Sequence, residues 1–169
     1  MENSQARLIF NVLMAQLEQE IATTRRVLAA VPAGKEDYRP HPVSKSALDL
    51  AWHLATSDYW FLASIARGQF IAEEARLPEG VRSAPDVVAW YDRNVPPLIE
   101  RLKTLPDEEL ARIVPMFDIM RLPAVQYLLV MMLHAAHHRG QLSAYLRPMG
   151  GRVPAIYGAS ADEQPSSTA

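Results

Sequence analysis

The chain has no cysteine among its 169 residues. This absence excludes disulfide bonds, a cysteine nucleophile, cysteine-ligated zinc and iron–sulfur clusters. The chain also has no large excess of charge of either sign, because its 17 basic residues are nearly balanced by 19 acidic ones. A nearly neutral chain offers no electrostatic basis for binding nucleic acid or an anionic membrane surface, and we expect neither partner.

Long hydrophobic runs are also missing. The longest, residues 122–136, contains Pro123, Gln126 and His134 and is shorter than the roughly 20 residues that a membrane-spanning helix needs. The N-terminal segment MENSQARLIF lacks the basic and apolar regions of a secretory signal. These features predict a soluble, cytoplasmic protein, and its length suits one domain with a sizeable core.

The main pattern in the sequence is the helical periodicity of its apolar residues. Apolar residues recur at steps of three and four over residues 4–30, 46–67, 85–105 and 123–147. No strand-like alternation of useful length interrupts this pattern. The sequence therefore predicts an all-α protein in which four helices form a bundle.

Several residues indicate where these helices begin, end or bend. Ser46 suits an N-cap position, with Asp49 three residues later in the place of a capping-box acid. Gly68 is a natural end for the same helix. Pro96 and Pro97 lack backbone donors inside the third periodic segment, so we expect a kink or a restart there.

We expect residues 1–150 to form the single bundle domain and residues 151–169 to form a C-terminal tail. Val153, Ile156 and Tyr157 are apolar enough to dock on the bundle. The last residues are polar, and we expect them to be flexible.

Four of the histidines lie in apolar helical segments, where an unpaired imidazole costs free energy. His134, His137 and His138 lie within one apolar helical segment, and His53 interrupts another. Imidazoles on hydrophobic faces need partners, and a bound cation satisfies several at once. On a helix, His134 and His138 are about 40° apart and His134 and His137 about 60°, so spacing leaves both pairs open as a metal clamp.

His53 would supply a third ligand from a neighbouring helix. Three imidazoles without a carboxylate leave room for water or substrate on the ion, as in catalytic sites. An ion-free alternative has each ring hydrogen-bonded to Asp49, Ser57, Gln141 or a tyrosine hydroxyl. His41, in the loop RPHP, is expected at the surface.

Two segments resemble a known family. The run HAAHHRGQLSAYLRPMGG resembles the HxxxHRGQ helix of DinB/YfiT-like proteins, and SALDLAWHLATSDYWFL resembles their second helix. The resemblance extends over about residues 5–150. It implies a DinB/YfiT-like four-helix bundle, often a homodimer, with three histidines around a divalent metal. Position by position, it selects His53, His134 and His138 as metal ligands and leaves His137 as an addition.

Neighbours of these histidines acquire candidate roles. Gln141 lies on the same side of its helix as His134 and His138. Its amide could face the ion or, as we expect, form a hydrogen bond between helices. Tyr127 could line the same cavity, but we expect a core tyrosine with a bonded hydroxyl. Arg139 points away from the side of the helix that carries His134 and His138, and it should pair with an acid or a helix end. Gly140 would allow a neighbouring helix to approach closely.

The metal and its chemistry are less constrained. Imidazole ligands suit zinc, nickel, iron or copper, and we expect zinc or nickel, with iron or manganese as alternatives. Metal affinity should fall as pH drops through about 6. The resemblance implies a metal-dependent enzyme, either a thiol S-transferase or a hydrolase. A thiol would have to arrive as a small cosubstrate such as a glutathione-like molecule. Glu20 and Asp58 are the candidates for a general base, without a placement that favours either.

Two other functional hypotheses remain at this point. One is a non-catalytic, metal- or ligand-binding stress-response protein that acts as a dimer. The other is a purely structural bundle without an ion. We predict a homodimer in any case, from the resemblance and from the large apolar side chains of Trp52, Trp60, Phe61 and Trp90.

Overall fold

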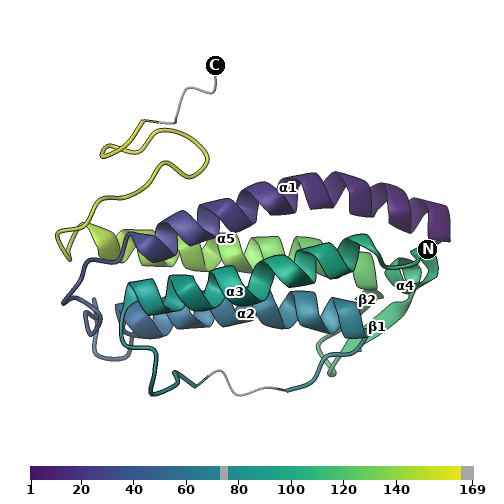
Figure 1. The fold of residues 1–169 in the computed structure, drawn as a ribbon, viewed down its shortest axis with the longest axis horizontal. Helices are drawn as coiled ribbons and strands as arrows, with labels where there is room; N and C mark the ends of the chain where they lie inside the picture. Colours follow the sequence, from purple (N-terminus) through teal and green to yellow (C-terminus); the bar gives the residue numbers. More distant parts are fainter. Residues whose placement is uncertain (73–75, 165–169) are drawn as a thin grey trace.

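Four long helices lie side by side and form the body of the molecule (Figure 1). The computed structural model describes residues 1–72 and 76–164. Each long helix turns an apolar side inward, and together these sides form one hydrophobic core. The predicted all-α four-helix bundle is therefore confirmed. The helices are α1 (Asn3–Ala29), α2 (Ala47–Arg67), α3 (Ala84–Lys103) and α5 (Tyr127–Leu146).

The order of the helices brings α2 and α5 into contact. Helix α2 packs against α3 and α5, and α1 packs against the same two helices, so α1 and α2 lie on opposite corners. Figure 1 shows α2 and α3 running in one direction and α1 and α5 in the other. The connection between α2 and α3 therefore returns along the length of the bundle.

The predicted ends of α2 are confirmed. The Ser46 hydroxyl accepts a hydrogen bond from the Asp49 backbone N–H at 3.0 Å and donates one to the Asp49 carboxylate at 2.6 Å. Gly68 ends the helix in the left-handed conformation, with φ of 71°, which glycine adopts without a steric penalty.

Of the kink or restart predicted at Pro96 and Pro97, the restart is wrong, because α3 is one helix through both prolines, and the kink stays a prediction. The carbonyls that lose their donors belong to Asp92 and Arg93. These residues and both prolines lie on the exposed side of α3, where water can replace the missing hydrogen bonds.

A two-stranded hairpin contradicts the prediction that strands are absent. After the short helix α4 (Asp107–Ala111), strand β1 (Ile113–Met116) pairs antiparallel with β2 (Met120–Pro123). The short helix η1 (Ala124–Gln126) follows, so α5 begins at Tyr127 instead of near Pro123 as predicted.

Tyr127 explains why this hairpin forms at the end of the bundle. Its side chain is fully buried, and its hydroxyl donates to the carbonyls of Val114, at 2.7 Å, and Met120, at 3.3 Å. Tyr127 is therefore the predicted core tyrosine with a bonded hydroxyl, and it attaches the hairpin to α5.

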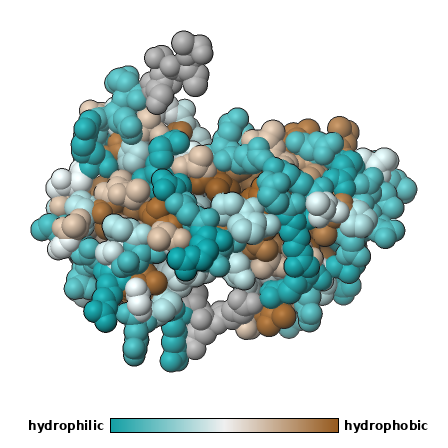
Figure 2. Space-filling view, in the orientation of Figure 1, coloured by the Kyte–Doolittle hydropathy of each residue, from teal (hydrophilic) through white to brown (hydrophobic). Residues whose placement is uncertain are grey.

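The tail contacts the bundle through its first part. Val153 and Ile156 pack against the core, whereas the side chain of Tyr157 is 70% exposed and attaches through its hydroxyl, which donates to Glu20 at 2.9 Å. The predicted flexible end, residues 165–169, lies outside the described residues. The face in Figure 2 is largely hydrophilic with scattered hydrophobic patches. No described helix combines the length and apolarity that crossing a bilayer requires.

Candidate metal centre

Three histidines converge between α2 and α5. His53 projects from α2, and His134 and His138 project from successive turns of α5. The Nε2 atom of His138 lies 3.1 Å from Nε2 of His53 and 3.1 Å from Nε2 of His134. One ring nitrogen from each lies within 4.8 Å of the others, so the group could hold a metal ion. Ligand nitrogens in a tetrahedral zinc site are about 3.3 Å apart, given Zn–N bonds of about 2.0–2.1 Å.

The three rings are held in the neutral form that binds metal. Partial burial, followed by the charge of His138, lowers the pKa of His53 from 6.5 to about 4. Burial and the neighbouring histidines lower the pKa of His134 to about 4 as well. Burial also lowers the pKa of His138, although its hydrogen bond with Gln141 acts in the opposite direction. Protons therefore compete with a cation at a lower pH than the value of about 6 expected from free histidine.

Gln141 orients the central ring. Its Oε1 atom lies 3.0 Å from Nδ1 of His138, within the same helix. Gln141 thus does not form the predicted bond between helices. An amide oxygen can only accept, so Nδ1 of His138 carries the proton and its Nε2 presents a lone pair. Metal-binding histidines are commonly oriented by such a second hydrogen bond.

The donor set fits a divalent cation better than an ion-free arrangement. Nε2 of His138 offers one lone pair, yet Nε2 of both His53 and His134 lies within hydrogen-bond distance of it. One cation would satisfy three such lone pairs. Of the ion-free partners named above, Gln141 alone forms a hydrogen bond with a site histidine within the part of the chain that the structure describes, and Asp49 is bonded to Ser46 and Arg39 instead.

One feature of the site is unfavourable. Nδ1 of His134 is buried and has no partner in the described part of the chain. An unsatisfied buried N–H costs about 1–3 kcal/mol. Binding of a structural zinc ion contributes about 10–16 kcal/mol, so the cost does not exclude a metal.

The other histidines lie outside the group. His137 is exposed on α5, its ring centroid 4.8 Å from that of His138, and it is no ligand of the three-membered group. His41 is exposed, as predicted, and its Nδ1 accepts from the Val43 backbone. The predicted close helix approach at Gly140 is wrong, since a Cβ there would meet nothing within 4 Å.

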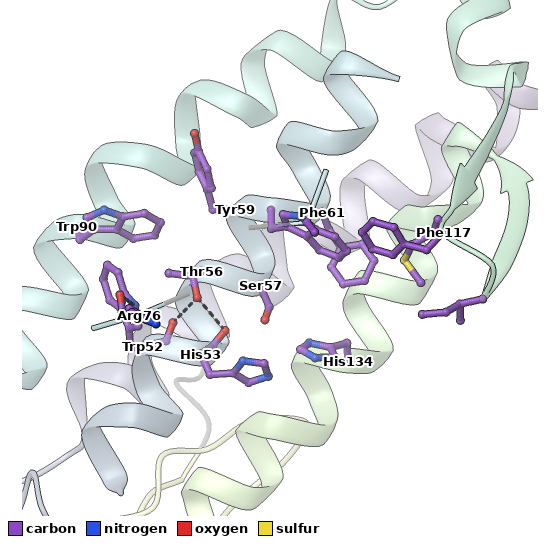
Figure 3. Close-up of a pocket in the computed structure, with 14 residues that line it drawn as sticks. Trp52, His53, Thr56, Ser57, Tyr59, Phe61, Arg76, Trp90, Phe117 and His134 are labelled. Carbon is purple, nitrogen blue, oxygen red and sulfur yellow. Dashed lines mark hydrogen bonds between the residues drawn. The ribbon is translucent and has the colours of Figure 1, made fainter. Parts of the chain in front are cut away.

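A cleft of about 530 Å³ opens beside the histidines, and His53 and His134 form part of its wall (Figure 3). Aromatic side chains make up half of the other lining residues. The hydroxyl of Ser57 points toward the space between His53 and His134 (Figure 3). The aromatic lining residues are Trp52, Tyr59, Trp60, Phe61, Trp90 and Phe117.

Several lining residues were not singled out from the sequence. Met116, Phe117 and Ile119 reach the cleft because the hairpin folds over the end of α2. The available signal was the apolar run IVPMFDIMRLP around one acidic residue, which is too short and irregular to identify as two strands.

His53 also lines a second cavity. It has a volume of about 460 Å³ and shares Trp52, His53 and Arg76 with the aromatic cleft. Arg39 and Lys45 add positive charge to its wall, and Asp49 adds a carboxylate. The histidine group is thus reached through an apolar cavity and a polar one.

Glu20 and Asp58 do not serve as bases at this site. Both belong to a polar cluster inside the bundle, and neither lines the two cavities. Arg139 forms an ion pair with Glu20, which confirms the predicted acidic partner. Asp58 accepts a hydrogen bond from the Tyr91 hydroxyl at 2.7 Å, and burial raises the pKa of Asp58 to about 7.

Comparisons with known proteins agree with this architecture. The chain belongs to the DinB family, whose model matches residues 1–166. It is similar to a DinB-like protein from Bacillus cereus, with 23% identity and a TM-score of 0.72 over 86% of this chain and 95% of that one. A DinB-like protein from Bacillus subtilis has 22% identity and a TM-score of 0.66 over 82% and 92%. These structures support the fold alone, and the search of curated proteins found no match.

Proposed function

We propose that the protein binds one divalent metal ion through His53, His134 and His138 and acts as a metal-dependent enzyme. The convergence of three neutral imidazoles carries this proposal, with Nε2 of His138 3.1 Å from each of the other two. Zinc or nickel suits these ligands best. Three protein ligands leave the ion open to an exogenous group, and the adjoining cavities supply the route to it.

The chemistry divides between the ion and the residues around it. When bound, a divalent ion supplies Lewis-acid activation of a nucleophile such as water or a small-molecule thiol. Gln141 keeps the ring of His138 in its ligating orientation. The aromatic wall excludes water from one side, and Ser57 offers a hydroxyl to a bound reactant. This arrangement supports thiol S-transfer or hydrolysis.

The alternative is a non-catalytic protein that binds a metal or ligand as part of a stress response. One observation favours it: no Asp or Glu lines the aromatic cleft in the described part of the chain. General acid–base catalysis by a carboxylate is therefore not provided there. Turnover of a glutathione–electrophile pair or of a simple ester, lost with a chelator and restored by zinc or nickel, would support the enzyme. A metal-loaded protein inactive with both substrate types would support the alternative.

Elemental analysis tests the metal site directly. The purified protein should contain close to one divalent ion per chain, and the double variant His134→Ala/His138→Ala and the single variant His53→Ala should lose it. His137→Ala is the matched control, because His137 is an exposed histidine on the same helix, and it should retain the metal. Equal metal content in all four proteins would refute the assignment.

We also propose a homodimer, but on different residues from those expected. Trp52 and Phe61 are buried, and Trp60 and Trp90 line the cleft, so these side chains are not a free surface. Apolar side chains are exposed on the outer sides of the neighbouring helices α1 and α5. They are Leu8 and Val12 on α1 and Leu129 and Leu133 on α5.

Light scattering at micromolar concentration tests the dimer. The parent protein should have twice the mass of one chain, and Val12→Glu/Leu133→Glu should be monomeric. A monomeric parent protein would contradict the proposal.

A further inference from the structure

The cleft beside the histidines has an unusually aromatic wall. Trp52 and Trp90 meet edge to face at 4.8 Å between ring centroids, and Tyr59 extends this group from the other side of Trp90. Trp60 and Phe117 lie nearly parallel, 17° apart, with centroids separated by 6.4 Å. Aromatic rings pair at centroid distances of about 4.5–7 Å, so the Trp60–Phe117 pair is at the loose end of this range.

Two of the three tryptophans that line the cleft, Trp52 and Trp60, have their indole N–H groups bonded elsewhere. The indole N–H of Trp60 donates to the Ile71 carbonyl at 2.7 Å, and that of Trp52 donates to the Arg76 carbonyl at 3.0 Å. The indole rings therefore offer π faces and apolar edges to the cavity. Among the described lining residues, Arg76 is the only one with a permanent charge.

The hairpin presents apolar side chains at the rim. Phe117 is 46% exposed and Ile119 is 69% exposed, although both line the cleft. Phe117 also has a φ of 51°, a left-handed conformation that a bulky side chain adopts at a cost of about 1–2 kcal/mol. Unusual backbone of this kind is retained chiefly at functional positions. A ligand in the cleft would cover both side chains and gain their apolar surface.

Three polar groups of the cavity wall lie together at the histidines: the rings of His53 and His134 and the Ser57 hydroxyl (Figure 3). The volume of about 530 Å³ is within the range of about 300–1,000 Å³ that small-molecule sites occupy.

We propose that this cleft binds a planar aromatic compound that carries one polar group, with its ring packed against the aromatic wall at Trp60 and Phe117 and its polar group beside the histidines. The inference names the substrate class of the proposed metal site and so rests on that proposed function for the polar end. The aromatic wall itself consists of protein side chains and does not depend on the ion.

Calorimetric titration with 1-naphthol tests the proposal, and 1-octanol serves as a non-planar probe with the same single hydroxyl. Zinc-loaded protein should bind one 1-naphthol per chain, at least about tenfold more tightly than 1-octanol. Removing zinc should weaken 1-naphthol binding severalfold. Equal affinity for both probes, or identical binding with and without zinc, would overturn the proposal.

Two isoleucines of the hairpin provide a matched pair of variants. Ile119 lines the cleft, whereas Ile113 is 49% exposed on the same hairpin and does not. Ile119→Ser should weaken 1-naphthol binding about tenfold, and Ile113→Ser should leave it unchanged. Phe117→Leu should weaken 1-naphthol binding and spare 1-octanol, because it keeps an apolar side chain without the ring. Equal losses from both serine variants would refute the site.

The two proposals fail in different measurements. Zinc content reports on the histidines and does not depend on the probe. A protein with one zinc and no 1-naphthol binding would overturn the aromatic site and leave the metal site standing. A protein without zinc that binds 1-naphthol through Ile119 would overturn the metal site and the placement of the polar group, and it would leave the aromatic wall as the binding surface.

Discussion

Arg139 is the largest fully buried side chain of the protein's described part, and its charge is matched by one acid. Its guanidinium donates to the backbone carbonyl of Glu20 at 3.0 Å, to the Thr24 hydroxyl at 2.9 Å, to the carboxylate of Glu20 and to the Tyr157 hydroxyl. Glu20 is 7% exposed. The pair joins α1 to α5 one residue beyond His138, so it also fixes how α5 sits in the bundle.

Removing either charge should destabilise the fold strongly. Arg139→Met leaves the Glu20 carboxylate buried without its cation, and Glu20→Gln leaves the guanidinium without its anion. Each single substitution should lower the free energy of unfolding by about 3–5 kcal/mol. The double variant leaves the pair without an uncompensated charge, and it should cost only about 3 kcal/mol for the three hydrogen bonds lost at Thr24, the Glu20 carbonyl and the Tyr157 hydroxyl.

Urea unfolding followed by circular dichroism measures these differences. Arg25→Met/Asp92→Asn is a suitable control, because this pair also joins two helices but is exposed, and it should have a far smaller effect. If the double variant at Glu20 and Arg139 lost as much stability as the sum of the single variants, the two charges would not be coupled, and the reasoning would be refuted.

Three further predictions concern single residues. The pKa of Asp58 is raised from 3.8 to about 7 by burial, so the folded state retains a proton that the unfolded chain releases. The free energy of unfolding should therefore fall as pH rises from about 4 to 7, by up to about 1.4 kcal/mol per pH unit, and Asp58→Asn should remove this slope in urea titrations. Phe117→Gly should be more stable than Phe117→Ala by about 1 kcal/mol in thermal unfolding, because only alanine keeps a Cβ at positive φ. Gln141→Ala should weaken zinc binding about tenfold in a competition assay with a chromogenic chelator, whereas Gln141→Glu keeps an acceptor for His138 and should bind zinc normally.

Each of these has a contrary result. The same pH slope in Asp58→Asn and in the parent protein would show that another group titrates. Equal stability of the glycine and alanine variants at position 117 would mean that the backbone there is unstrained. Equal zinc affinity in Gln141→Ala and the parent would show that the amide does not orient His138.

Long helices with capped ends were predictable from the sequence, since their signals are local. The apolar period over residues 46–67, the cap at Ser46 and the glycine at position 68 all lie within the helix they define. The hairpin was not predictable, because its strands have four residues each and depend on the hydroxyl of Tyr127 from the next helix. A short strand held by a tertiary contact carries little local signal.

The candidate site likewise combines features with a local sequence signal and features that depend on tertiary contacts. The residues alone proposed His134 with either His137 or His138, and His53 as a third ligand; the resemblance selected His138, and the structure brings His53, His134 and His138 together. Gln141 was noticed but assigned the wrong partner, since an amide on a helix reaches both its own helix and the next one. The aromatic cleft required the bundle, because the hairpin residue Phe117 meets side chains from α2 there, far away in the sequence.

The spacing of the histidines along the chain determines how far an ion can reinforce the fold. His134 and His138 are four residues apart, so a transient helical turn in the denatured chain already offers a cation two ligands. His53 is 85 residues from His138 and joins them only when the distant segments have met. A cation that also binds the denatured chain stabilises the native state by less than its full affinity. The resulting gain in stability therefore comes chiefly from the single long-range ligand, and without that imidazole a cation would no longer protect the fold against denaturation.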